Sequence, residues 1–540
     1  MIEAILTPAT RAQGPRIYLK MPFDPVLNAK VKRIGGKFDR TGKRWWLHDT
    51  PLARRTLRRV FSDELKGLPP AGQSPASAAC AAVYELPRYL MQHQARDVKR
   101  ARSEDRWGFF NDTGTGKTLI GIEIAKMLRV KTVVICPKRL IRNAWIDDLE
   151  KWGAGELRFA SLRDTKSKDI EKTIKANDVL LINFESFAKY SQALIDGGVR
   201  MLMIDESSKI KGEKSKITKE VLAFAEHMDH CYLFSGTPAP NTELEYFSQV
   251  ACLAPELFGK SYYTFRAEFF NPYGFGGFQW RMKPERRAEF KALLAQCSSS
   301  VSKSDVLDLP ERVFCVRDVE LSAEEKRVYE EMKNKLIAEI ECSAGAPDEG
   351  EEPRKVEAYN AAVKLMKLRQ VTSGFIMDEN GAVHEFGRSK LDALLDLLEE
   401  IGQHQAIIWT QFIHEAAQIQ AALGERAVVC NGSAKNEAAL QEAIDAFKSG
   451  AAQYLIAHPR TLAHGVTLVN CTYSIDYSQS YSYEEYHQKN DRIYRKGQRN
   501  ACTYYSLQVP KSVDVAAFLA VSDKRANAEE MLDYIKHSKI

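Results

Sequence analysis

Phe109-Phe110-Asn111-Asp112-Thr113-Gly114-Thr115-Gly116-Lys117-Thr118 is the stretch that decides the fold of this chain. Its glycines let the backbone wrap a polyphosphate, and the N–H groups of the loop and of a following helix would face the phosphate oxygens. In such a loop Lys117 contacts the β- and γ-phosphates, and the Thr118 hydroxyl binds Mg²⁺. Asn111 stands where the full pattern has its first glycine. A plain glycine-rich turn is the alternative, and the helical pattern over residues 119–128 argues against it.

Two carboxylates end an apolar run about ninety residues downstream, in the sequence Leu202-Met203-Ile204-Asp205-Glu206. In an acidic pair at the C-terminal end of a strand, near a phosphate loop, the two carboxylates have different roles. Asp205 would hold Mg²⁺, and Glu206 would polarise the attacking water. We therefore predict ATP and Mg²⁺ as cofactors, with Thr118 and Asp205 as the metal ligands.

Continuous apolar runs predict two α/β domains. Such runs, rather than alternating ones, are typical of parallel strands buried on both faces of a sheet. The first set covers residues 132–136, 179–183, 201–204 and 231–234, and the second covers 406–410, 427–430, 454–457, 473–477 and 503–507. Helical patterns such as 437–447 separate the runs. We expect two doubly wound parallel sheets.

The region between the two sets is less regular. Residues 262–280 are dense in aromatics and glycine, and Ser322-Ala323-Glu324-Glu325 is a capping box that opens a helix. That helix has apolar residues at 328, 332, 336 and 340, and runs into an acidic loop at 344–353. We expect helical insertions with a structural role.

Composition excludes several classes of protein. The 540 residues carry a net charge of +6, and 44% are hydrophobic, as in ordinary globular chains. No run approaches the ~18 apolar residues of a membrane span and the start does not resemble a signal peptide, so we expect a cytoplasmic protein with no membrane partner. Ten cysteines without a C-x-x-C pair indicate reduced packing residues and no structural zinc.

The basic charge is concentrated at the N-terminus. Residues 1–65 hold fourteen Lys/Arg and six Asp/Glu, a net of +8, so the remaining residues sum to −2. Strand patterns at 17–19 and 43–47, with a helix at 25–34, predict a small α+β module. A stretch rich in Pro, Ala and Ser at 66–83 indicates a linker, which would let this module move independently.

Basic and aromatic residues alternate in the second strand of this module, as Lys43-Arg44-Trp45-Trp46. Such a surface suits gripping phosphates and stacking on bases. The alternative is that one of the two tryptophans fills the core of the module.

Two further segments have residues that could respond to a bound nucleotide or act in its hydrolysis. Ser235-Gly236-Thr237-Pro238 follows an apolar run, where hydroxyl groups can sense the phosphates; an ordinary turn is the alternative. Near the C-terminus, the segment 488–498 sets Arg492 and Arg495 on one side of a helical turn. Such arginines can neutralise transition-state charge on a phosphate, whereas the plain alternative is a solvated basic helix.

Together these segments resemble the motif series of superfamily-two helicases, and within it the Swi/Snf family of double-stranded DNA translocases. The resemblance covers about residues 84–510 and includes the segments 90–94 (Q motif), 112–118 (motif I), 143–145 with Pro137 (motif Ia), 205–211 (motif II), 235–238 (motif III), 365–370 and 463–468 (second-domain motifs), and 488–498 (motif VI). It implies two RecA-like lobes.

The resemblance also implies a role for each site residue. Nucleotide binding falls to Gln94, which would read adenine, and to Asp112, Thr113, Gly114, Thr115, Gly116, Lys117, Thr118, Asp205 and Gly465. Catalysis falls to Lys117, Glu206, Arg492 and Arg495, and coupling to Ser235, Gly236, Thr237 and Gln488. DNA binding falls to Asn143, Lys209 and Lys211, beside Lys43, Arg44, Trp45 and Trp46.

Two departures from the family pattern stand out. Ser207-Ser208 replaces the Ala-His of motif II, which bears on how hydrolysis couples to DNA. Ala463-His464 stands where motif V often has paired glycines, which bears on a DNA contact. The N-terminal module, in turn, resembles a HARP-type domain through Phe23-Asp24, the following helix and the Trp45-Trp46 strand, which implies an annealing helicase acting on forked DNA.

The sequence thus predicts a DNA-dependent ATPase that moves along double-stranded DNA and remodels or reanneals branched DNA in replication or repair. Its parts are a basic module (1–65), a linker (66–83), lobe 1 (84–305), and lobe 2 with a helical insertion and a C-terminal helix (306–540). We expect a monomer of bacterial or phage origin. Two alternatives stay open: a strand-separating DNA or RNA helicase, and a nonenzymatic ATP-gated DNA clamp or scaffold.

Overall fold

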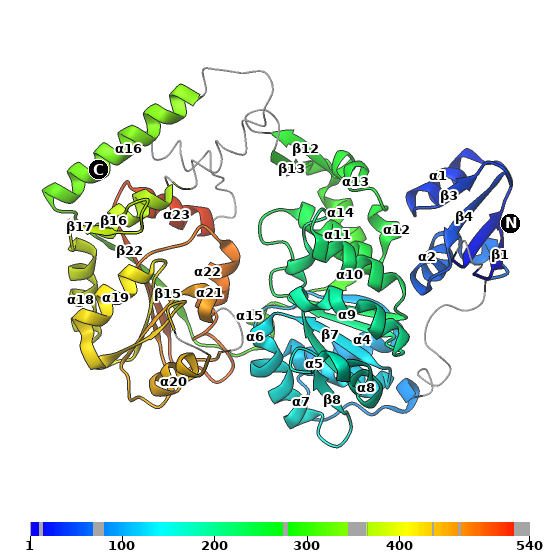
Figure 1. The fold of residues 1–540 in the computed structure, drawn as a ribbon, viewed down its shortest axis with the longest axis horizontal. Coiled ribbons are helices and arrows are strands. Elements are labelled where there is room, and N and C mark those ends of the chain that lie inside the picture. The colour runs from blue at the N-terminus through cyan, green and yellow to red at the C-terminus, as the bar shows by residue number, and fades with distance from the viewer. Residues whose placement is uncertain are drawn as a thin grey trace. The chain divides into compact units, whose positions relative to one another are not determined.

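The chain forms two compact units, Met1–Leu307 and Asp308–Ile540 (Figure 1). This computed structural model describes residues 2–9, 14–68, 80–273, 279–343, 363, 365–434, 437–462 and 466–522. The first unit holds the N-terminal module and lobe 1, and the second holds lobe 2. Most of the expected linker and the acidic segment 344–353 lie outside the described residues.

The N-terminal module is a five-stranded mixed sheet with two helices, in the strand order β3-β4-β2-β1-β5. Its elements are β1 (Ile2–Thr7), β2 (Arg16–Lys20), α1 (Pro25–Arg33), β3 (Lys37–Asp39), β4 (Arg44–His48), α2 (Pro51–Phe61) and β5 (Leu65–Lys66). The predicted elements β2, α1 and β4 are confirmed, and β1, β3, α2 and β5 were not predicted. Helix α1 begins where the Asp24 carboxylate accepts hydrogen bonds from the N–H groups of Val26 and Leu27.

Neighbouring tryptophans of β4 point to opposite faces of this sheet, as the two-residue period of a strand requires. Trp45 packs against the module core and donates its Nε1–H to Asn28 Oδ1 at 2.8 Å. The Trp46 ring lies on the other face, with the Arg16 guanidinium 3.8 Å from its centre. One of the two tryptophans therefore supports the core, as the alternative reading of this segment held.

Lobe 1 is built on a seven-stranded sheet in the order β14-β6-β11-β10-β7-β9-β8, and all its strand pairs are parallel. The strands are β6 (Arg106–Phe109), β7 (Thr132–Cys136), β8 (Phe159–Ser161), β9 (Val179–Asn183), β10 (Met201–Asp205), β11 (His230–Phe234) and β14 (Ser298–Ser299). The main helices are α4 (Gln92–Ser103), α5 (Lys117–Leu128), α8 (Ile170–Ala176), α9 (Phe184–Asp196), α10 (Lys216–Glu226) and α11 (Tyr246–Leu253).

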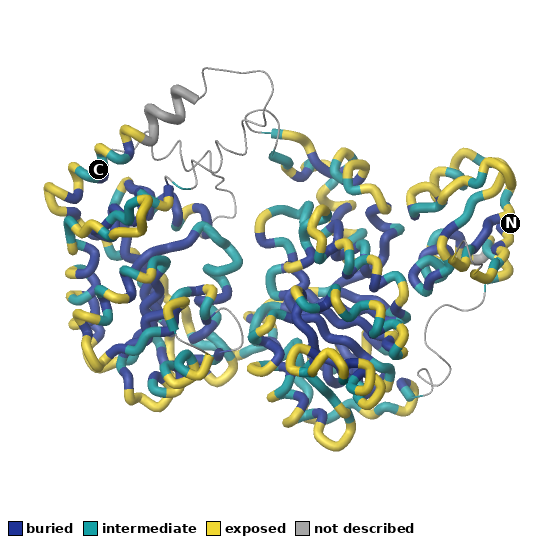
Figure 2. Tube along the Cα trace, viewed as in Figure 1, coloured by how far each residue is buried: buried dark blue, intermediate teal, exposed yellow. Residues whose placement is uncertain are grey.

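Both faces of this sheet are covered, because alternate residues of one strand enter two different cores. In β7, Val133 and Ile135 belong to one core cluster, whereas Val134 and Cys136 belong to the other. The central strands are buried along their whole length (Figure 2). This burial explains why their sequences are continuously apolar.

The aromatic region 262–280 belongs to lobe 1. It forms α13 (Tyr262–Phe269) and a hairpin of β12 (Phe270–Tyr273) and β13 (Gln279–Met282), followed by α14 (Arg287–Leu294). Phe265 and Phe290 of these helices join the first core cluster. The segment therefore has the structural role that was expected of it.

Lobe 2 is built on a six-stranded parallel sheet in the order β15-β22-β21-β18-β20-β19. The strands are β15 (Arg312–Asp318), β18 (Ala406–Trp409), β19 (Ala427–Cys430), β20 (Tyr454–Ala457), β21 (Tyr473–Asp476) and β22 (Cys502–Gln508). The helices include α16 (Ala323–Ser343), α18 (Ser389–Ile401), α19 (Ile413–Leu423), α20 (Glu437–Lys448), α22 (Tyr483–Asn490) and α23 (Val513–Ser522). The predicted α/β fold of two RecA-like, doubly wound lobes after a small α+β domain is confirmed.

The capping box predicted for α16 is confirmed by two reciprocal hydrogen bonds. The Glu325 N–H donates to Ser322 Oγ at 3.2 Å, and the Ser322 N–H donates to Glu325 Oε2 at 2.7 Å. These bonds satisfy two of the N–H groups that a helix start leaves without intrahelical partners.

Within the first unit, the N-terminal module contacts lobe 1 through arginines. Arg33 donates to the Leu257 carbonyl and Arg55 to the Leu253 carbonyl, each at 3.0 Å. Arg59 forms an ion pair with Glu256 at 3.1 Å. These contacts differ from the expected independent movement of the module, because they hold it to α11 and to α12 (Pro255–Phe258).

Among the described residues, no helix combines the length and the apolar character needed to cross a bilayer. Within that same part of the chain, no three His, Cys, Asp or Glu side chains gather in a way that could hold a metal ion.

Candidate functional site

The phosphate loop lies where the sequence placed it, between the end of β6 and the start of α5. Gly114 and Gly116 have φ angles of +82° and +83°, in the left-handed region that favours glycine. A β-carbon on Gly116 would stand 2.2 Å from Gln94 Nε2. Both glycines are therefore required by the path of the loop, which leads directly into the N-terminus of α5.

The loop is held closed by its own side chains. Lys117 Nζ donates to the carbonyl oxygens of Asn111 at 2.9 Å and Asp112 at 3.0 Å, and Thr115 Oγ1 donates to Asp112 O at 2.8 Å. On the other side, Asp112 Oδ2 accepts the Lys303 N–H at 2.8 Å. The lysine expected to contact phosphates therefore lies over the loop, at the start of α5.

Helix α4 fixes the same loop through Gln94. Its Nε2 donates to the Thr115 carbonyl at 3.0 Å, and its Oε1 accepts the Met91 N–H at 3.0 Å. The side chain is buried, and both ends of its amide are bonded within the protein. Gln94 thus positions the phosphate loop in this structure, and its contact with adenine stays a prediction.

Asn111 has a structural reason to replace the usual glycine. Its Nδ2 donates to Asp97 Oδ2 at 2.7 Å, which ties the start of the loop to α4, and both side chains are fully buried. Burial raises the pKa of the Asp97 carboxyl, and the hydrogen bond from Asn111 opposes that shift. The sequence did not single out Asp97.

The acidic pair ends β10, as predicted. Asp205 Oδ2 accepts the Trp145 Nε1–H at 2.9 Å, and its Oδ1 accepts the Glu206 N–H at 3.1 Å. Burial raises the pKa of Asp205, whereas the charge of Lys117 lowers it, so the phosphate loop and the acidic pair share one electrostatic site. Glu206 is buried and has a φ of +59°, a conformation that is strained for a non-glycine residue.

These groups fit ATP and Mg²⁺. The carboxylate of Asp205 and the hydroxyl of Thr118 are the hard oxygen ligands that Mg²⁺ prefers. No side chain caps the N-terminus of α5 among the described residues, because Gly116 is the N-cap. In a phosphate-binding loop, the N–H groups of such a first turn donate to phosphate oxygens.

The turn that follows β11 lies against the phosphate loop. A β-carbon on Gly236 would stand 2.8 Å from Thr113 Cγ2 and 3.1 Å from Thr113 N, so the turn and the loop are in close contact. Ser235 is buried, and its Oγ accepts the Thr237 N–H at 3.2 Å. Three of the four residues predicted to couple the site to the rest of the chain thus lie in the turn that contacts Thr113, and the fourth, Gln488, lies in α22 of the second unit.

A glutamine that the sequence analysis missed joins the acidic pair to this turn. Ser207 Oγ donates to Gln249 Oε1 at 2.6 Å, and Gln249 Nε2 donates to the Pro238 carbonyl at 2.7 Å. All three residues are buried. The serine that departs from the motif II pattern therefore supplies a hydroxyl to a relay between motifs II and III. In the sequence, the unusual Ser207 was the one signal that pointed to this relay.

The residues predicted to bind DNA lie in two places of the first unit. On lobe 1, Asn143 and Lys209 are exposed, whereas Lys211 is half-buried and pairs with Glu245 at 3.2 Å. On the module, Lys43 and Arg44 are exposed, and Trp45 and Trp46 are half-buried. Their contacts with DNA stay predictions.

In the second unit, the arginines of motif VI bind the described part of motif V, residues 466–468. Arg492 is buried and donates to Gln488 O at 2.9 Å and Val466 O at 3.3 Å. Arg495 donates to Thr467 Oγ1 at 3.1 Å. Gly465, Ala463 and His464 lie outside the described residues.

A buried ion pair supports this segment from below. Lys489 Nζ lies 2.6 Å from Asp476 Oδ1, at the end of β21, and 2.6 Å from Gln479 Oε1. The side chains of Lys489 and Asp476 are almost fully buried. Each is the oppositely charged partner that a buried charge requires. The turn that carries Arg492 and Arg495 is therefore anchored to the sheet.

The phosphate loop, the acidic pair and the hydroxylated turn define a helicase-like ATPase. Residues 89–372 match the SNF2-related domain, and residues 389–497 match the helicase conserved C-terminal domain. The chain therefore belongs to the SNF2-related family. The predicted enzyme class, a DNA-dependent ATPase, and the Swi/Snf resemblance are confirmed. Both matches begin after the N-terminal module, whose HARP-type resemblance stays a prediction.

Several relatives resemble the chain at low identity. Protein p41 of Acyrthosiphon pisum secondary endosymbiont phage 1 is 23% identical over 478 residues, which cover 83% of this chain and 98% of p41. An ATP-dependent helicase of Mycoplasma pneumoniae is 21% identical, over 79% of this chain and 40% of that protein. The DNA repair and recombination protein RAD54-like of Drosophila willistoni is 26% identical, over 35% of this chain and 27% of that protein. The chain thus spans less than half of the last two.

Among solved structures, the SWI2/SNF2 ATPase core of Sulfolobus solfataricus in complex with dsDNA aligns with a TM-score of 0.38 and 20% identity. The alignment covers 85% of this chain and 99% of that chain.

Proposed function

We propose that the chain is an ATP-dependent translocase on double-stranded DNA that remodels or reanneals branched DNA in replication or repair. The observation that carries the proposal is the complete set of hydrolytic groups in an SNF2-related chain. Lys117, Asp205 and Glu206 meet at one site of lobe 1, and Arg492 and Arg495 are retained in lobe 2. A nonenzymatic clamp is disfavoured, because a retired ATPase has no use for such a set.

Each group has a part in hydrolysis. Lys117 would exchange its loop carbonyls for the β- and γ-phosphates, and Thr118 and Asp205 would hold Mg²⁺. Bound Mg²⁺ would neutralise charge on the phosphate oxygens. Glu206 would orient the attacking water, while Trp145 fixes the carboxylate of Asp205. Arg492 and Arg495 would supply further positive charge.

Movement along DNA requires that the state of the nucleotide reach the rest of the lobe. The relay from Ser207 through Gln249 to Pro238 offers such a path, because it links the acidic pair to the turn that touches Thr113. A change at the phosphates would thus shift both motifs together. Asn143, Lys209 and Lys211 would contact the DNA backbone, and the N-terminal module would select branched DNA.

The cellular setting belongs to the same proposal. Similarity to a phage protein supports a bacterial or phage-infected cell as the setting, and similarity to a RAD54-like repair protein supports action on DNA. In this proposal, the chain acts in the cytoplasm as a monomer.

Steady-state ATP hydrolysis tests this function. The purified chain would be assayed without DNA and with single-stranded, blunt duplex and forked DNA. Strong stimulation by duplex or fork is the expected result. Hydrolysis that does not respond to DNA would favour the clamp, and stimulation by single strands or RNA alone would favour a strand-separating helicase.

A further inference from the structure

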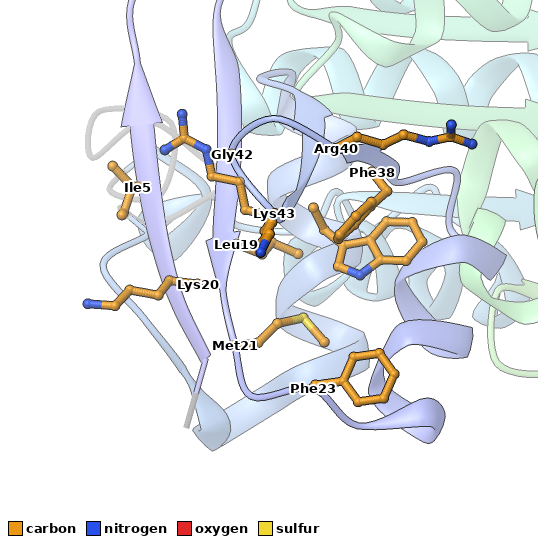
Figure 3. A pocket seen from close by; sticks show the side chains of 11 residues that line it. Ile5, Leu19, Lys20, Met21, Phe23, Phe38, Arg40, Gly42 and Lys43 are labelled. Carbon is orange, nitrogen blue, oxygen red and sulfur yellow. The ribbon is translucent and has the colours of Figure 1, made fainter.

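An open groove of about 740 Å³ lies on the N-terminal module (Figure 3). Three sets of residues form it: β1 with the end of β2, the segment before α1, and β3 and β4 with the turn between them. Its lining residues are Ile5, Leu19, Lys20, Met21, Phe23, Phe38, Arg40, Gly42, Lys43, Arg44 and Trp45. The groove is called the basic groove below.

Two phenylalanines of the basic groove are held in solvent. Phe23 is 91% exposed and Phe38 is 50% exposed. Figure 3 shows both on one side of the groove, with Lys20 on the other. Exposed aromatic rings that gather in one concave site, rather than singly, mark a binding surface.

Local structure explains why Phe23 stays exposed. It precedes the N-cap Asp24, the position from which an apolar residue usually packs against the fourth residue of the helix. That fourth residue is Asn28, whose Oδ1 is bonded to Trp45. Phe23 therefore lacks the apolar partner that would normally cover it, and it stays exposed in the lining of the groove.

The rim of the basic groove is cationic. Lys20, Arg40, Lys43 and Arg44 are all exposed, and none of the lining residues is acidic. Two of these cations have carboxylate neighbours outside the lining, Glu3 at 3.5 Å from Lys20 and Asp39 at 3.8 Å from Arg44. Such exposed pairs are weak and exchange readily for a polyanion.

Lys43 also has an unusual backbone. Its φ is +47°, a left-handed conformation in which a non-glycine residue is strained. Lys43 therefore lines the groove from a turn position that glycine would take without strain.

We propose that the basic groove binds unpaired nucleotides of single-stranded DNA. Phe23 and Phe38 stack on bases, while Lys20, Arg40 and Lys43 contact phosphates. Exposed aromatic faces beside a basic track are the arrangement that binds single strands without sequence preference. A duplex cannot use the phenylalanines, because its bases are stacked on one another. The inference rests on the proposed function in one respect, namely that the nucleic acid bound in the groove is DNA.

Two substitutions separate stacking from charge. Phe23→Ala should weaken binding of single-stranded DNA by about tenfold, since one stacked base is lost. Lys43→Gly should weaken it by about threefold and lower the slope of log K against log salt by about 0.7, the value for one phosphate contact on a single strand. Neither change should impair folding, because Phe23 is exposed and glycine relieves the strain at position 43.

The test is fluorescence anisotropy of the full chain with labelled oligothymidylate and with labelled blunt duplex. Tyr263→Ala is the matched control, because this ring is 61% exposed on α13, outside the groove. The proposal is supported if Phe23→Ala loses affinity for oligothymidylate while Tyr263→Ala does not. It is overturned if both variants bind alike, or if Phe23→Ala loses equal affinity for the duplex.

Competition with poly-glutamate tests whether the groove binds an acidic protein instead of DNA. If poly-glutamate displaces oligothymidylate as well as unlabelled DNA does, the groove is a charge surface for acidic proteins and the proposal fails. Duplex-stimulated ATP hydrolysis of the unmodified chain is measured in parallel. If that stimulation is absent while binding still depends on Phe23, the translocase proposal fails and the groove assignment stands.

Discussion

The phosphate loop of lobe 1 and the basic groove of the N-terminal module differ in how their side chains are held. At the loop, Lys117, Asn111 and Gln94 of the neighbouring helix α4 are each bonded to a named partner within the protein. In the groove, Phe23 and Lys43 project into solvent. The first region is built from side chains with bonded partners, and the second from exposed side chains.

This difference fits the work proposed for each region. Hydrolysis needs a few groups fixed to within a fraction of an ångström at the reacting atoms. Sequence-independent binding of a strand needs several similar contacts, none of which must be exact in position. Removing one fixed group should therefore cost far more than removing one groove residue.

Glu206→Gln should give the largest effect and should affect one region alone. ATP hydrolysis is expected to fall by roughly 10²- to 10⁴-fold, because an amide cannot accept a proton from water. Binding of ATP and of oligothymidylate should be retained. Steady-state hydrolysis and nucleotide binding by fluorescence check this, with the exposed Glu171→Gln as control. Normal hydrolysis in Glu206→Gln would remove the role of this carboxylate.

Trp145→Phe should have an intermediate effect. The ring is kept, but Asp205 loses the Nε1–H donor at 2.9 Å that orients its carboxylate. The affinity for Mg²⁺ in nucleotide binding is expected to fall by roughly 10- to 100-fold, as for other partners of metal ligands. A Mg²⁺ titration of nucleotide binding measures it, with Trp152→Phe as control. An unchanged Mg²⁺ titration would show that the hydrogen bond from Trp145 does not orient the Asp205 carboxylate.

Gln249→Leu should affect coupling more than binding. It removes both bonds of the relay and leaves the buried Ser207 hydroxyl and Pro238 carbonyl without this partner, at a cost of about 1–3 kcal/mol in unfolding free energy. We expect ATP binding to persist while stimulation by DNA falls several-fold. The ratio of hydrolysis rates with and without duplex checks this, and exposed Gln192→Leu is the control. A normal ratio would exclude the relay.

His230 should give the smallest effect, on the pH dependence of folding. Burial, with Arg106 nearby, lowers the pKa of this imidazole to about 4, so the folded state keeps it neutral. The unfolded chain takes up the proton below about 6.5, so stability should fall as pH drops from about 6.5 toward 4, by at most about 1.4 kcal/mol per pH unit. Asp105, whose pKa burial raises, opposes part of this loss.

Thermal unfolding at several pH values between neutrality and mild acid tests the role of His230. The melting temperature of the natural chain should fall more steeply with acid than that of His230→Gln, because the variant lacks the titrating ring. Equal slopes in the two proteins would assign the pH dependence to other groups.

The sequence predicts lobe 1 well because its chemistry is local. The residues of the phosphate loop are consecutive, and Asp205 and Glu206 end a strand that is buried on both faces. Asp97 and Gln249 could not be found in this way, since each is one polar residue on a helix and its partner is distant in the chain. The same holds for the basic groove, where Lys20 and Arg40 come to line one groove only after β1 to β4 have paired.

The arginine contacts between the N-terminal module and lobe 1 change what the joining chain is for. Arg33, Arg55 and Arg59 of the module already bind Leu257, Leu253 and Glu256 of lobe 1. The chain that joins the module to lobe 1 therefore acts as a tether, which raises the effective concentration of the module near lobe 1. The two pieces could then be produced as separate polypeptides and recombined. Their reassembly would depend on concentration and would weaken with salt.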